Sequence, residues 1–167
     1  GYVIELYRSM IFMKPDFQVT YGTRYPFIFY LRPYLVYRDG GAAFNSGVTS
    51  HLIDGHRGMF TANQLKEAVS GRADIHAPYS RLVCIENTTN KGGGACWDFN
   101  ELQKIKQICD DKKLAFHLDG ARLFNALVAK NESPKQYGEL FDTISICLSK
   151  GLGAPVGSIL LGTKEHI

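Results

Sequence analysis

Short apolar segments alternate with amphipathic segments after Asp39, and this alternation limits the possible folds more than any other feature. Strand character is found in residues 81–87, 114–119, 142–149 and 157–162. Residues 98–113 place apolar side chains at steps of three and four, the period of an amphipathic helix, and residues 121–131 predict a shorter helix. Strands that alternate with helices predict an α/β fold, with a mainly parallel sheet flanked by helices.

A further helix is predicted from its start signal. Thr61 is a candidate N-cap, and Gln64 follows three residues later, the spacing of a capping box. Apolar residues then recur until Gly71, which is a typical stop.

The first 37 residues break this pattern. They hold 11 of the 20 aromatic residues, and Pro15, Pro26 and Pro33 interrupt them without a sustained helical or strand period. We therefore divide the chain into an atypical aromatic-rich segment, residues 1–37, and a partial large domain, residues 38–167. The segment is either an apolar arm that packs on a partner or the product of truncation or mis-splicing. The second interpretation is favoured because locally inconsistent sequence is weak evidence of a folded element.

The composition excludes several classes of protein. A net charge of +3 is too small to predict a nucleic-acid interface. None of the four cysteines forms a CxxC pair and no two histidines form an HxxxH pair, so no metal site is expected. The longest apolar run, residues 25–37, is interrupted by Arg32 and two prolines, so no membrane span is expected. Unpaired thiols are typical of a reducing compartment, and we expect a cytoplasmic protein.

Three predicted strands end in chemically reactive side chains. A carboxylate, Glu86, ends the first, Asp119 ends the second with Arg122 close behind, and Ser149 and Lys150 end the third. The carboxyl ends of parallel strands lie along one edge of a sheet, where ligands of α/β proteins bind. We therefore expect a carboxylate, a guanidinium and an amine to gather at this edge.

Each of these residues also has an ordinary interpretation. Asp119 could be a helix N-cap, and Lys150 could be an exposed loop lysine. Arg122 could be a surface residue in the first turn of a helix, although a cation there opposes the helix dipole and favours a nearby anion.

The combination of groups points to pyridoxal-phosphate chemistry. A lysine amine forms a Schiff base with the cofactor aldehyde, and a carboxylate keeps the pyridine nitrogen protonated. An arginine binds a substrate carboxylate through two parallel hydrogen bonds. The small residues that follow Lys150 let the backbone pass close to a cofactor.

Four motifs resemble one family. The segments HLDGARLFNA (117–126), CLSKGLGAPVGSILLG (147–162), IENTTN (85–90) and DIHAPYSRL (74–82) are similar to those of the low-specificity L-threonine aldolases. These are pyridoxal-phosphate lyases of the aspartate-aminotransferase fold, also called fold type I, and the resemblance covers residues 38–167.

The resemblance implies a role for each candidate residue. Lys150 would be the Schiff-base lysine, Asp119 the pyridinium partner and Arg122 the ligand of the substrate carboxylate. His76 would lie near the substrate hydroxyl as a candidate base, although alone it reads as a turn residue. Ser149 would touch the cofactor phosphate, and a plain strand-end serine is an equal interpretation.

The reaction implied is a retro-aldol cleavage of the Cα–Cβ bond of threonine or allo-threonine. It yields glycine and acetaldehyde, so the protein would serve threonine catabolism and glycine biosynthesis. The family is homo-oligomeric, with sites at subunit boundaries.

The sequence also departs from the family. Thr89 replaces the histidine of ENTHN, and the position of another family histidine falls at about Pro33. The N-terminal phosphate-binding loop and the C-terminal small domain have no counterpart, and the glycines of residues 90–97 lack the phosphate-loop arrangement. We therefore expect the middle of such an enzyme. A β-eliminating pyridoxal-phosphate lyase on the same fold and a non-catalytic fragment remain as alternatives.

Overall fold

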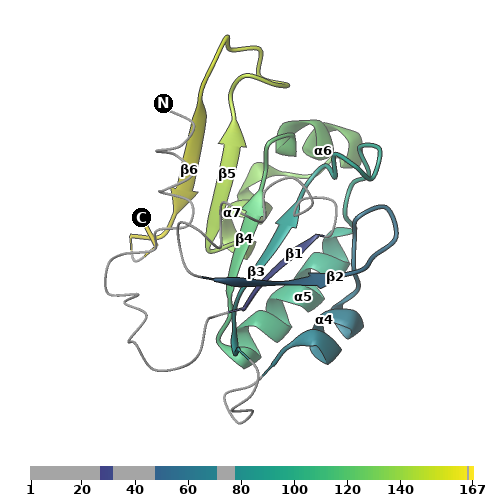
Figure 1. The fold of residues 1–167 in the computed structure, drawn as a ribbon. Coiled ribbons are helices and arrows are strands. Elements are labelled where there is room, and N and C mark those ends of the chain that lie inside the picture. Colours follow the sequence, from purple (N-terminus) through teal and green to yellow (C-terminus); the bar gives the residue numbers. More distant parts are fainter. Residues whose placement is uncertain (1–26, 32–47, 71–77, 165) are drawn as a thin grey trace.

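The computed structural model describes residues 48–70, 78–164 and 166–167, together with the backbone of residues 27–31. Its strands form one sheet in the order β2-β1-β3-β4-β5-β6 (Figure 1). They are β1 (Phe27–Leu31), β2 (Thr49–Ile53), β3 (Ser80–Glu86), β4 (Ala115–Asp119), β5 (Thr143–Cys147) and β6 (Ser158–Gly162). All neighbours are parallel except β5 and β6, which confirms the predicted mainly parallel sheet.

The predicted helices form where the sequence placed them. They are α4 (Ala62–Ala68), α5 (Phe99–Lys112) and α6 (Leu123–Lys130). The capping box of α4 is present, because Thr61 Oγ1 accepts from the amide of Gln64 and Gln64 Oε1 accepts from the amide of Thr61. Asp98 caps α5 by accepting from two amides of its first turn.

Three elements were not predicted. The helix α7 (Pro134–Leu140) starts with proline, which suits a first helical position. The strand β2 is only five residues long. The strand β1 lies inside the aromatic-rich segment and pairs with both β2 and β3. FIFYL is a continuous apolar run without alternation, a pattern typical of strands in parallel sheets. The division of the chain at residue 37 stays a prediction.

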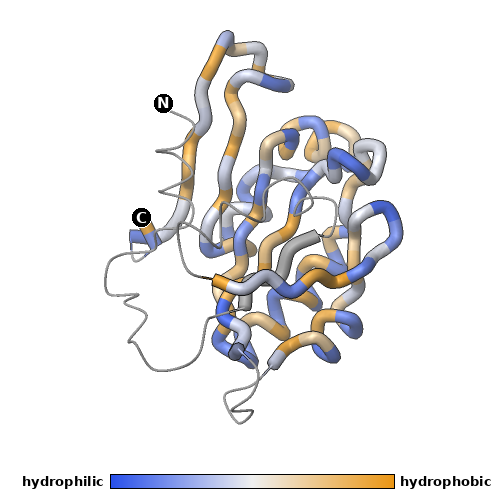
Figure 2. The backbone as a smooth tube through the Cα atoms, viewed as in Figure 1, coloured by the Kyte–Doolittle hydropathy of each residue, from blue (hydrophilic) through white to orange (hydrophobic). Residues whose placement is uncertain are grey.

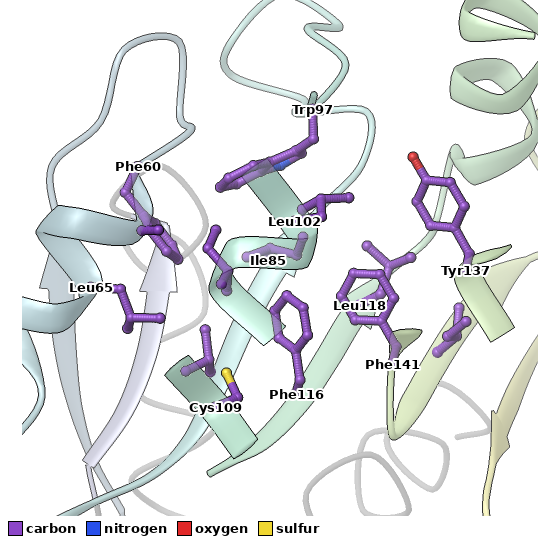
Figure 3. Packing of buried hydrophobic residues seen from close by; sticks show 14 of the residues in the cluster. Phe60, Leu65, Ile85, Trp97, Leu102, Cys109, Phe116, Leu118, Tyr137 and Phe141 are labelled. Carbon is purple, nitrogen blue, oxygen red and sulfur yellow. The ribbon is translucent and has the colours of Figure 1, made fainter. Parts of the chain in front are cut away.

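Alternating strand residues separate the two faces of the sheet. Inward-facing residues of β3, β4 and β5 pack with α4, α5 and α7 in one hydrophobic core (Figure 3). Phe116 and Phe141 lie at its centre with ring centroids 4.2 Å apart, and Trp97 and Tyr137 are also fully buried. Hydrophobic residues recur along β3, β4, β5 and β6 in Figure 2, whereas the loop after β2 is largely hydrophilic. The residues between these core positions, including Glu86 and Asp119, therefore face the other side of the sheet.

Among the described residues, no helix has the length and hydrophobicity that a membrane crossing requires. The same residues contain no cluster of three side chains that could hold a metal ion.

Candidate active site

The loops that follow β3, β4 and β5 start side by side at the carboxyl edge of the sheet. Glu86 pairs with Asp119, and Asp119 pairs with Ser145. Two hydrogen bonds extend the ladder past the strands. The amide of Asn87 donates to the carbonyl of Asp119 (3.0 Å), and the amide of Gly120 donates to the carbonyl of Ser145 (2.8 Å). The main chain at Asp119 is therefore fixed to both neighbouring strands.

Asp119 is not the N-cap of α6. The structure gives that position to Arg122, while Asp119 Oδ1 accepts from the amide of Ala121 (3.1 Å) in a local turn. Gly120 between them is tightly packed, because a Cβ atom there would lie 2.8 Å from the carbonyl oxygen of Ser145. The half-buried Asp119 carboxylate is thus held at the edge of the sheet rather than used as a helix cap.

Arg122 lies at the N-cap of α6, one position before the first helical turn, and its side chain makes no capping hydrogen bond. Within the described part of the chain its guanidinium forms no ion pair or hydrogen bond. A half-buried cation in this position is available to an anionic ligand.

Lys150 lies in the hairpin loop between β5 and β6. The amide of Leu148 donates to the carbonyl of Gly157 (2.9 Å), and the amide of Gly153 donates to the carbonyl of Lys150 (3.0 Å). Gly151 is pressed against α6, since a Cβ atom there would lie 2.5 Å from Asn125 Oδ1. The backbone of Lys150 is thus held within its own loop, next to the Asn125 side chain of α6, while its side chain and that of Ser149 are exposed.

Glu86 is the most constrained acid of this edge. Its Oε2 accepts from the amide of Asn90 (2.9 Å), and its main-chain carbonyl accepts from Trp97 Nε1 (2.9 Å). Burial raises the pKa of its carboxyl, and the Asp119 charge raises it further. The Asn90 amide, Arg122 and Lys150 act in the opposite direction without cancelling the rise. Arg122, Asp119 and Lys150 are therefore all close enough to Glu86 to influence its charge.

Sequence reasoning missed two buried polar residues beside this edge. Asn87 is fully buried, its Nδ2 donates to Tyr137 Oη (3.2 Å), and its Oδ1 has no partner within the described structure. His117 lies two residues before Asp119, with Nδ1 2.7 Å from Thr143 Oγ1. Burial lowers the pKa of His117 to about 4, against the opposing effect of Asp119. Asn87 and His117 both belong to motifs quoted above. Their position at or near the end of a predicted strand was the sequence signal that could have identified them.

The glycine-rich loop after β3 is a packed turn. Arg57 Nε donates to the carbonyl of Gly92 (2.8 Å), and Arg57 Nη2 donates to that of Gly93 (3.2 Å). Thr89, at the position of the family histidine, is buried beneath this loop, and a Cβ atom on Gly92 would lie 2.3 Å from its Oγ1. Gly92 is therefore packed too tightly to carry a side chain.

The structure therefore brings together Glu86, Asp119, Arg122 and Lys150, with Ser149 in the same loop as Lys150. The predicted base His76 lies outside the described residues, as does Pro33. The catalytic and binding roles of these residues stay predictions.

The fold is shared with a solved threonine aldolase and with an aspartate aminotransferase. A threonine aldolase structure from Leishmania major superposes with a TM-score of 0.74 at 22% identity, covering 97% of this chain and 45% of that one. An aspartate aminotransferase from Thermus thermophilus superposes with a TM-score of 0.68 at 12% identity, covering 99% of this chain and 40% of that one.

Curated relatives are more similar in sequence. The low specificity L-threonine aldolase of Saccharomyces cerevisiae is 46% identical over 129 residues, which are 77% of this chain and 33% of the yeast protein. The low specificity L-threonine aldolase of Escherichia coli O157:H7 is 42% identical over 133 residues, 79% of this chain and 39% of that protein. The chain thus spans well under half the length of these relatives.

The family model for beta-eliminating lyases matches residues 33–167, which include β2 to β6 and all the described loops of the carboxyl edge. On that match, the chain belongs to the beta-eliminating lyase family.

Proposed function

We propose that this chain forms part of a pyridoxal-phosphate-dependent carbon–carbon lyase, a threonine aldolase. Its substrate would be threonine or allo-threonine, cleaved to glycine and acetaldehyde. The observation that carries the proposal is the meeting of Lys150, Asp119 and Arg122 at one sheet edge. The names of the curated relatives support the same substrate class.

The residues at this edge fit the cofactor. The exposed amine of Lys150 lies in a hairpin loop that backbone hydrogen bonds hold in place. The carboxylate of Asp119 lies at the end of the neighbouring strand β4. The third group is the guanidinium of Arg122, which forms no ion pair among the described residues. When bound, pyridoxal phosphate withdraws electrons from the bond that breaks at the substrate Cα.

Each residue then has a defined task. Lys150 Nζ would hold the cofactor through its aldehyde carbon, and Asp119 would keep a proton on the ring nitrogen. Arg122 would orient the substrate through its carboxylate. His76 would remove the hydroxyl proton of the substrate, directly or through water, and Ser149 would contact the phosphate.

We extend the proposal to assembly and location. A second copy of the chain would complete each site, as expected for a homo-oligomer. Cys84, Cys96, Cys109 and Cys147 are all free thiols, which supports a reducing compartment such as the cytoplasm.

A second candidate is β-elimination from an amino acid, which the name of the family model favours. The same lysine, carboxylate and guanidinium would serve it, because both reactions need an electron sink bound next to Cα. The two differ in which bond breaks, and therefore in the products.

Product analysis separates these functions. The purified chain with pyridoxal phosphate is incubated with L-threonine, L-allo-threonine or L-serine, and glycine, acetaldehyde, ammonia and the keto acids 2-oxobutanoate and pyruvate are measured. We expect glycine and acetaldehyde in equal amounts from L-threonine or L-allo-threonine, and loss of both in Lys150→Ala but not in Lys130→Ala, which changes an exposed lysine of α6. Ammonia with a keto acid would favour elimination instead. An absence of any product would support the non-catalytic alternative.

A further inference from the structure

A second acid, Glu86, stands beside Asp119 at the carboxyl edge, and the proposed mechanism does not use it. The two residues are paired in the register of parallel β3 and β4. Paired residues of neighbouring strands point to the same face of a sheet, and such strands lie about 4.8 Å apart. Ile85 and Leu118 fill the hydrophobic core on the opposite face. The Glu86 and Asp119 side chains are therefore neighbours on the face that leads to the site.

Glu86 is held in this place by its surroundings. The residue is 9% exposed, its carboxylate accepts from the Asn90 amide, and its carbonyl accepts from the Trp97 indole. Turning this side chain toward water would break its hydrogen bond with the Asn90 amide. The edge therefore contains two adjacent carboxyl groups, of which one is buried and fixed.

The charges that face Glu86 come from all three loops of the edge. Asp119 ends β4, Arg122 precedes α6 and Lys150 follows β5. Burial and the neighbouring Asp119 charge favour the protonated form of Glu86, whereas the two cations and the Asn90 amide favour its ionised form. Burial and the Asp119 charge outweigh the opposing groups, so the pKa of Glu86 is raised.

We propose that Glu86 is a positioning residue whose burial beside Asp119 favours its protonated form, so that the negative charge of the pair is drawn to Asp119. This inference rests on the proposed function, in which Asp119 faces the ring nitrogen of the cofactor. Two adjacent carboxylates resist double ionisation, and the buried member of the pair takes the proton. The negative charge of the pair is thereby placed on Asp119, the residue proposed to face the ring nitrogen.

The test is a titration of the side-chain carboxyl groups by ¹³C NMR in the chain without cofactor. The Glu86 signal is assigned by its loss in Glu86→Gln. Its midpoint is expected above the ordinary glutamate value of about 4.3. Asp119→Asn removes a like charge and should lower this midpoint, whereas Lys150→Ala removes an opposite charge and should raise it.

These variants keep the local hydrogen bonds, since glutamine and asparagine retain an oxygen for the amides of Asn90 and Ala121. Glu101 supplies an internal control, because the Ala62 amide and Lys104 lower its pKa and none of the substituted residues does. Its midpoint should be the same in all the variants.

Two results would overturn the inference. One is a Glu86 midpoint at or below the ordinary value. The other is a midpoint that Asp119→Asn and Lys150→Ala leave unchanged or move in the same direction. The titration needs no cofactor, so a chain that retains pyridoxal phosphate but fails this test would refute only the role of Glu86. A chain that passes this titration without retaining the cofactor would support the proposed role of Glu86 and contradict the proposed function.

Discussion

Asp119→Asn should lower the rate of glycine release from threonine about 10²–10³-fold, the usual loss when one preorganised electrostatic group is removed from an active site. Asparagine has the same shape and keeps the oxygen that accepts from the Ala121 amide. It lacks the negative charge that would hold a proton on the ring nitrogen. The fold should therefore survive while the reaction slows, and steady-state kinetics of glycine and acetaldehyde formation provide the measurement.

The matched control for this prediction is Asp111→Asn. Asp111 is exposed in α5, and its Oδ1 accepts from Gln107 Nε2, a bond that asparagine can also make. This variant should keep the native rate. Equal rates for native protein and Asp119→Asn, with far-ultraviolet circular dichroism unchanged, would show that Asp119 is not the carboxylate on which the reaction depends.

Phe116→Ala should reduce the free energy of unfolding by about 3–5 kcal/mol, the cost of removing a large aromatic side chain from a packed core. Phe116 is 0% exposed and its ring lies against that of Phe141, between the sheet and α5. Its loss would leave a cavity directly beneath β4, the strand that carries Asp119. Urea unfolding followed by circular dichroism gives the free energy.

Phe124→Ala is the control for this effect. Phe124 lies on α6 and is 37% exposed, so its truncation removes less buried area and leaves no enclosed cavity. Its effect should be well below that of Phe116→Ala. A loss of less than about 1 kcal/mol for Phe116→Ala would mean that the core shown in Figure 3 does not support the sheet as described.

Much of the fold follows from local sequence signals. The strands β3 to β6 and the helices α4 to α6 lie within one or two residues of their predicted ranges, because their apolar runs and caps are strong. The remaining elements have weaker signals. β1 is apolar at every position and β2 has only five residues, so neither has a readable period. α7 buries little besides Tyr137, and its start signal at Ser133 and Pro134 was the one available clue.

The sequence likewise predicted some features of the candidate site and not others. Parallel strands with reactive ends were enough to predict that Asp119, Arg122 and Lys150 meet. Sequence alone could not separate a helix cap from a sheet-edge carboxylate at Asp119, since the choice depends on where α6 begins. Asn87 and His117 were missed because their partners, Tyr137 and Thr143, lie 50 and 26 residues away along the chain.

The central claim is that Lys150 holds a cofactor aldehyde at this edge, and retention of pyridoxal phosphate tests it most directly. The purified chain is mixed with the cofactor, dialysed, and its visible absorbance is compared with those of Lys150→Ala and Lys130→Ala. The account predicts a band of retained cofactor in the native chain and in Lys130→Ala, and none in Lys150→Ala. A native chain that retains no cofactor, or a band that survives in Lys150→Ala, would contradict it.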